Sequence, residues 1–224
     1  MGNGDILMSK GKMVIPSIYE DAYDFMDGTT AVSVRDTIGD KSYKDFFIIN
    51  KKGKRISESF DFIGYRRKKS EQLIVAQRGN KYGFINGLGK VKIPFIYDNF
   101  SYRFSFTSSI SDHIISIQQN GKWGFIDVGF SEGKIIVSPQ YKDVGNFAFG
   151  MAWVSDGTKY SFINKMGNIV CGGYEGCSDF NSTGLALVKY NKNSNDAYLI
   201  NTRGEIIYYC NEEKGNLWNI RRSK

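Results

Sequence analysis

The sequence predicts an all-β protein built as a tandem array of about six hairpin-based units, and three observations support this. Residues 121–139, GKWGFIDVGFSEGKIIVSP, read as a strand, a glycine-containing turn and a second strand. The aliphatic residue before that turn recurs every 36 to 42 residues along the chain. The composition, 41% hydrophobic and 15% aromatic with only three prolines, suits a packed β-rich protein.

The recurring aliphatic residue is the anchor on which the units align, and a fixed period near 40 residues is typical of repeat architectures. The six anchors are Leu7, Ile49, Ile85, Ile126, Ile163 and Ile200. Asn or Asp follows the anchor in five copies, and a glycine stands three places later at Gly53, Gly89, Gly167 and Gly204. Because Asn and Asp cap turns through their side chains and glycine accepts left-handed geometry, we expect a hairpin turn after each anchor.

Taken in order, each unit is expected to supply about three strands. The first unit offers only the end of a leading strand, then strands at 13–16 and 30–34. The second, 44–62, is the most degenerate and has a polar return strand at 55–58. The remaining units follow at 81–98, 121–139, 159–173 and 197–209. We expect one domain over residues 1–210 and a polar tail or cap over 211–224.

Glycine beside an aromatic residue predicts close packing between strands. In a strand, Gly124 faces opposite to Trp123 and Phe125, so it leaves room for a neighbouring strand or ring. The positions expected to build the repeat in this way are Gly83, Phe84, Ile85, Trp123, Gly124, Phe125, Ile126, Phe162, Ile163 and Ile200.

Two architectures fit such an array, an open curved solenoid and a closed propeller. A propeller commonly closes by completing one blade with strands from both chain ends. The first unit lacks its leading strand, but the last unit has no evident spare strand to supply it. We therefore favour the open solenoid slightly over the closed propeller.

The segments 81–86, KYGFIN, and 122–127, KWGFID, with Gly89 and Gly133 and with Pro94 and Pro139 after them, resemble the bacterial WG-repeat family, also called KWG repeats. The resemblance runs from about Ile6 to Cys210. Units two, five and six lack the glycine of the namesake pair. The resemblance implies a non-enzymatic β-repeat scaffold, with no family catalytic residues to carry over.

The residues themselves also argue against an enzyme or a metal site. The one histidine, His113, has no second histidine to share a metal and is expected to be structural. Cys171 and Cys177 are wrongly spaced for a zinc knuckle, and Cys210 adds no second pair. The aspartates of 21–27 lack the closing Glu of a calcium loop. We expect no catalytic residue, no metal and no cofactor.

The net charge of +7 is concentrated in one window. Residues 41–69 hold ten Lys or Arg against three acids, while the rest of the chain is balanced. The candidate binding residues there are Lys51, Lys52, Lys54, Arg55, Arg66, Arg67, Lys68 and Lys69. They lie on a hairpin tip and a connector, with Phe60, Phe62 and Tyr65 between as stacking groups. A second interpretation is that these lysines keep exposed hairpins soluble and prevent edge pairing.

The sequence thus favours a scaffold that binds another macromolecule, in the first place a protein. The alternative is a binder of an anionic polymer or membrane surface, such as nucleic acid, acidic glycan or lipid, through residues 41–69. No apolar run reaches the length of a membrane span and the first 13 residues lack a signal-peptide core, which predicts a cytoplasmic protein. The sequence does not indicate an oligomeric state.

Overall fold

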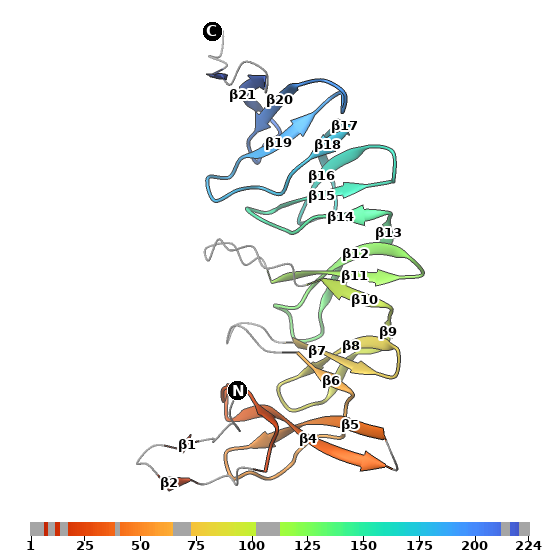
Figure 1. The fold of residues 1–224 in the computed structure, drawn as a ribbon, viewed down its shortest axis with the longest axis vertical. Helices are drawn as coiled ribbons and strands as arrows, with labels where there is room; N and C mark the ends of the chain where they lie inside the picture. Colours follow the sequence, from red (N-terminus) through yellow and green to blue (C-terminus); the bar gives the residue numbers. More distant parts are fainter. Residues whose placement is uncertain are drawn as a thin grey trace. The chain divides into compact units, whose positions relative to one another are not determined.

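The computed structural model describes residues 7–8, 12–13, 18–38, 41–64, 73–101, 113–211 and 216–219. Within these residues all the regular secondary-structure elements are β-strands (Figure 1). The first eleven strands are β1 (Leu7–Met8), β2 (Lys12–Met13), β3 (Asp21–Ala22), β4 (Thr29–Ile38), β5 (Lys41–Asn50), β6 (Phe62–Ile63), β7 (Leu73–Arg78), β8 (Lys81–Asn86), β9 (Val91–Tyr97), β10 (Asn99–Ser101) and β11 (Ile114–Gln119). The other eleven are β12 (Lys122–Asp127), β13 (Lys134–Tyr141), β14 (Asp143–Val144), β15 (Met151–Ser155), β16 (Tyr160–Asn164), β17 (Ile169–Tyr174), β18 (Gly176–Cys177), β19 (Ala186–Lys189), β20 (Asp196–Ile200), β21 (Ile206–Asn211) and β22 (Asn216–Asn219).

The strands form antiparallel sheets whose order follows the chain. Beyond the β1–β2 hairpin, the sheets are β3–β5, β6–β9, β10–β13, β14–β17 and β18–β22. Four of the five sheets therefore hold more than the three strands expected of a unit, because a short strand (β6, β10, β14 or β18) pairs beside the first long one. The predicted all-β tandem array is confirmed.

The chain divides into two compact units, which we describe separately. The first comprises residues 1–99 with 128–134, and the second comprises 100–127 with 135–224. In the first unit, Ala31, Phe46 and Ile48 of the β3–β5 sheet share a buried core with Ile74 and Ile85 of the next sheet. Packing between chain neighbours thus holds this unit together.

The second unit repeats this arrangement twice. One core joins Phe125 and Val137 of the β10–β13 sheet to Val154 and Ile163 of the β14–β17 sheet. Another joins Phe162 of the β14–β17 sheet to residues of the β18–β22 sheet, including Val188 and Ile200. Within each unit, then, the sheets form a solenoid-like array in which each sheet packs on its neighbour in the chain.

The anchors occupy the centre of these cores. Ile49, Ile85, Ile126, Ile163 and Ile200 are all 0% exposed. The turn after four of them is held by the Asn side chain, whose Oδ1 accepts the backbone N–H groups two and four residues later. These bonds run to Lys52 and Lys54, Leu88 and Lys90, Met166 and Asn168, and Arg203 and Glu205, at 2.9 to 3.1 Å.

The glycine beside the aromatic residue is required by the backbone of the return strand. A Cβ on Gly83 would lie 2.8 Å from Ile93 O, and one on Gly124 would overlap Val137 O. In the fifth unit Ser161 replaces this glycine, but Gly172 stands opposite it, and a Cβ there would lie 2.7 Å from Ser161 Cβ. The missing side chain has moved to the partner strand, so the close approach is kept.

One expected strand does not form. Residues 55–58 make no regular return strand: their pairing with β5 consists of an isolated bridge from Ile49 to Arg55 and a hydrogen bond from the Ile56 N–H to Ile48 O, and Phe60 forms a further isolated bridge with Phe46. The reason lies in the polar sequence: the Ser57 hydroxyl accepts the Ile48 N–H at 2.8 Å, where a strand would offer a carbonyl. The first unit's strand at 13–16 lies largely outside the described residues.

The chain's last described segment continues the final sheet. β22 pairs antiparallel with β21, with Leu217 opposite Cys210 and Trp218 opposite Tyr209. The β18–β22 sheet therefore has a fifth strand on the edge that β9, β13 and β17 leave open in their own sheets.

The turn glycine of one hairpin rests on the return strand or segment of the preceding one. A Cβ on Gly204 would lie 2.9 Å from Cys171 Cβ, and one on Gly167 would lie 2.9 Å from Val137 Cγ2. On Gly89 it would overlap Ser57 Cβ. The three glycines have φ of 76° to 80°, so both conformation and space demand glycine.

We expect Gly204→Ala to lower the free energy of unfolding by about 2 to 4 kcal/mol, from left-handed strain plus overlap with Cys171. Gly121→Ala is the matched control, because Gly121 has φ 71° but open space around its Cα. It should cost only about 1 kcal/mol. Urea unfolding followed by circular dichroism measures both, and equal losses would contradict the packing role.

Candidate functional site

Three features of the described surface are candidate sites, and the first is the basic tip of the hairpin that follows β5. Lys51, Lys52 and Lys54 surround the Asn50 turn and are exposed. None of the three forms an ion pair within the described part of the chain. Arg66 to Lys69, predicted to act with them, lie outside the described residues.

Arg55 is positioned differently from these lysines. Its guanidinium lies 4.4 Å from the centre of the Phe47 ring and donates to Ser57 O at 2.9 Å and Ser59 Oγ at 2.5 Å. It therefore holds the irregular return segment in place. Phe60, expected as a stacking group, is 2% exposed and belongs to the core, and Tyr65 lies outside the described residues.

The second feature is a set of apolar side chains at hairpin tips and on return strands. Leu88, Phe130 and Met166 are 61%, 54% and 75% exposed, each on a turn after a central strand. Sequence reasoning missed them because it treated the turns as polar. The signal was present, since two of these residues stand two places after the turn Asn, where other units have Lys or Arg.

In the second unit four of these side chains form what we call the apolar tip patch: Ile135, Met166, Ile169 and Val170, exposed by 44%, 75%, 65% and 39%. They belong to neighbouring hairpins, because Gly167, next to Met166, lies against Ile136 and Val137 of β13. The turn that carries Met166 is thereby placed beside the strand that carries Ile135.

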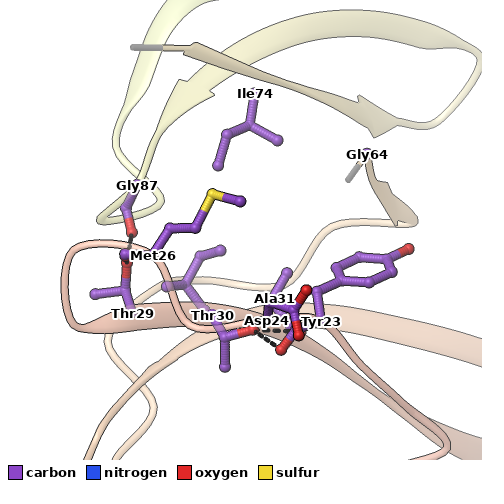
Figure 2. A pocket seen from close by; sticks show the side chains of 10 residues that line it. Tyr23, Asp24, Met26, Thr29, Thr30, Ala31, Gly64, Ile74 and Gly87 are labelled. Atoms are coloured by element: carbon purple, nitrogen blue, oxygen red, sulfur yellow. Dashed lines mark hydrogen bonds between the residues drawn. The ribbon is translucent and has the colours of Figure 1, made fainter. Parts of the chain in front are cut away.

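The third feature is a narrow cavity in the first unit, between the β3–β5 and β6–β9 sheets (Figure 2). Its volume is about 30 Å³, and its lining includes Tyr23, Met26, Ala31 and Ile74. Thr29 Oγ1 donates to Gly87 O across it at 2.8 Å. This volume suits a water molecule and excludes an organic ligand, so the cavity is a packing feature between repeats.

Comparison with known families accounts for this architecture. The family model described as "WG containing repeat" matches residues 9–37, 82–123, 123–160 and 160–193, and these segments together cover more than half of the 224 residues. The chain belongs to the WG-repeat family. The resemblance predicted from the 81–86 and 122–127 motifs is confirmed, and the family is one of repeat scaffold domains.

Solved structures resemble the WG-repeat chain in fold alone. One, described as the crystal structure of the eukaryotic initiation factor, matches with a TM-score of 0.50 and 11% identity, over 90% of this chain and 56% of that one. A second, KlHsv2 with loop 6CD replaced by a Gly-Ser linker, has a TM-score of 0.39 and 14% identity over 84% of this chain and 64% of that one. The WG-repeat chain thus spans less than two thirds of either. A search of curated proteins found no match.

The titratable groups of the WG-repeat chain show structural roles. Burial raises the pKa of the Cys177 thiol to about 12 and also raises that of Cys171, so neither is an activated nucleophile. Among the described residues no three His, Cys, Asp or Glu side chains gather as metal ligands. His113 precedes β11 with φ 52°. No helix in the described chain is long and apolar enough to cross a membrane.

Asp156 is the carboxylate whose pKa is lowered most clearly, to about 2. Its Oδ1 accepts Lys159 N at 3.0 Å, and Thr158 N and Thr158 Oγ1 both at 2.7 Å. These donors stabilise the ionised form and fix the turn between β15 and β16.

Because the folded pKa lies below the ordinary value, Asp156 contributes stability above about pH 4, and this contribution is lost as pH falls to about 2. We expect Asp156→Ala to have a lower melting temperature at pH 7, and the difference from the native chain to shrink between about pH 4 and pH 2. Asp156→Asn keeps an acceptor without the charge and should lose less. A pH-independent difference for Asp156→Ala, measured by thermal melts across this range, would contradict the assignment.

Proposed function

We propose that this WG-repeat chain is a non-catalytic scaffold that binds another protein through the apolar tip patch. The observation that carries the proposal is the exposure of four large apolar side chains on adjacent hairpin elements. Contiguous apolar surface on a soluble domain is characteristic of protein interaction sites, because burying it releases roughly 25 cal/mol per Å². The cores behind the patch hold it on a rigid framework.

The absence of a reactive constellation among the described residues is consistent with this proposal and does not carry it. What supports binding to a protein, in preference to a small molecule, is the shape of the patch. Met166 lies on the turn between β16 and β17, Ile169 and Val170 begin β17, and Ile135 lies on β13. A projecting apolar tip is complementary to a groove on a partner.

We expect the double variant Met166→Ser, Ile169→Ser to lose the retention of specific partners. Its free energy of unfolding should stay within about 0.5 kcal/mol of the native value, since both side chains are exposed. The measurement is quantitative mass spectrometry of proteins from the source organism's lysate that bind the immobilised chain. Leu88→Ser, which removes an apolar side chain that is 61% exposed on a turn of the other unit, is the control.

Salt separates this proposal from an electrostatic one. Apolar contacts are not screened, so partner retention should persist at about 1 M salt. If the double variant retains the same proteins as the native chain, the patch is not the binding surface. If Leu88→Ser loses them equally, apolar exposure in general, and not this patch, is responsible.

A second candidate function is binding of an anionic polymer or surface through the basic tip. It is favoured by one observation, the three exposed lysines Lys51, Lys52 and Lys54 on a single turn. Such a turn can approach a row of phosphates or sulfates, and each contact releases a counterion.

For this candidate we expect binding to heparin or duplex DNA to weaken steeply with salt, and the salt slope to fall by about two to three units when the three lysines become serine. Replacement of the same three by arginine should keep the slope. Fluorescence anisotropy over about 50 to 300 mM salt measures it. An unchanged slope in the serine variant would exclude the tip as the contact.

A further inference from the structure

An open polar hollow in the second unit lies apart from both surfaces discussed above, at the opposite ends of the β15–β16 strands from the Met166 turn. Its volume is about 430 Å³. The lining residues are Lys142, Asp143, Ser155, Gly157, Thr158, Tyr160, Glu175 and Lys192. This volume falls within the range of small-ligand sites, and the lining is polar.

The hollow coincides with a break in a pattern that the third and fifth units share. In these two units a lysine stands at or just before the start of the central strand, and an acid follows the tyrosine that ends the return strand. In the third unit Lys81 pairs with Asp98, and in the fifth Lys159 Nζ lies 2.8 Å from Glu175 Oε1. The fourth unit has Lys122 and Lys142 at these two positions, so the pair cannot form.

Lys142 is consequently left as a cation without an acid. Neither Lys142 nor Lys122 forms an ion pair within the residues that the structure describes. The backbone of Lys142 is fixed, because its N–H donates to Ser155 O at 2.8 Å. Its aliphatic stem lies against Gly157, where a Cβ would be 3.4 Å from Lys142 Cγ. The Lys142 side chain therefore lines the hollow from a fixed backbone.

Lys192 is the second lysine of the lining. Glu175 is already neutralised, since Oε1 pairs with Lys159 and Oε2 accepts the Lys192 backbone N–H at 3.1 Å. The Lys192 ammonium has no ion pair among the described residues. The charged residues of the lining are therefore Lys142 and Lys192 against Asp143 and Glu175, and because Glu175 is paired with Lys159, Asp143 is the carboxylate left to the two lysines.

Hydroxyl groups complete the lining. Ser155 Oγ accepts the Gly157 N–H at 3.1 Å, so its own proton remains available to donate. Tyr160 contributes a phenol, and Thr158 is held by Asp156. Both cations without an ion pair are lysines, and a lysine ammonium group binds phosphate as a point charge. The planar guanidinium of arginine is the group that matches a planar carboxylate with two parallel hydrogen bonds.

We propose that this hollow binds the phosphate group of a phosphorylated ligand between Lys142 and Lys192, with hydroxyl donors from Ser155 and Tyr160. The inference does not depend on the apolar tip patch or on the basic tip. The phosphate can belong to a small phosphorylated molecule or to a phosphorylated side chain of a partner, and the two share the chemistry recognised here.

The experiment is isothermal titration of the whole chain, at constant ionic strength, with inorganic phosphate, glycerol 3-phosphate and N-acetyl-phosphoserine amide. We expect saturable one-to-one binding of at least one probe, weakened about tenfold or more by Lys142→Glu and also weakened by Lys192→Gln. Lys142→Glu introduces the acid that the third and fifth units carry, so the unfolding midpoint of this variant should equal or exceed that of the native chain.

Lys90→Glu is the matched control, because it makes the same charge change at an exposed site in the other unit. Lys90→Glu should leave the affinity for each phosphate probe within about twofold of the native value. Tighter binding of glycerol 3-phosphate identifies a small molecule as the source, tighter binding of the phosphoserine probe identifies a side chain, and equal binding shows that phosphate alone is read. No binding by about 10 mM, or equal losses in Lys142→Glu and Lys90→Glu, would overturn the proposal.

Discussion

The contact between the turn glycine of one hairpin and the return segment of the hairpin before it is the constraint on which the rest of the structure depends. Gly89 lies on Ser57, Gly167 on Val137 and Gly204 on Cys171. Each contact brings one sheet against its neighbour, so the anchors behind the turns become fully buried. A side chain at any of these glycines would push two sheets apart and expose both cores.

This constraint explains why the repeat tolerates variation elsewhere. The namesake glycine can move from the central strand to the return strand, since in the fifth unit Ser161 stands at its position and Gly172 stands opposite. In the last unit Tyr198 and Tyr209 stand opposite each other, with their ring centres 5.5 Å apart. The pairing of β20 with β21 has one register shift, whereas the pairing of β16 with β17 in the fifth unit has two. Strand pairing thus adjusts locally while the stacking contact is kept.

Departures from the repeat are where function can reside, because the repeating positions are committed to packing. The tip residues at the third turn position do not contribute to the core, which leaves them free to be Lys52, Met166 or Arg203 in different units. The loss of one lysine–acid pair at Lys142 is another departure, and the hollow lies beside it. A single scaffold can therefore present several distinct surfaces at no cost to its stacking.

The all-β class, the period and the hairpin turns were predictable from the sequence, because they rest on local chemistry. Asn caps a turn and glycine reverses it wherever the chain goes, and anchors such as Ile126 and Ile163 mark the strands. The WG motif at 122–127 was recognisable for the same reason. The irregular segment at 55–58 was not predictable, since only the position of Ser57 against Ile48 shows that a hydroxyl replaces a carbonyl. The apolar tip patch and the Lys142 hollow were decided by tertiary structure alone, because they join residues from successive hairpins that no local pattern brings together.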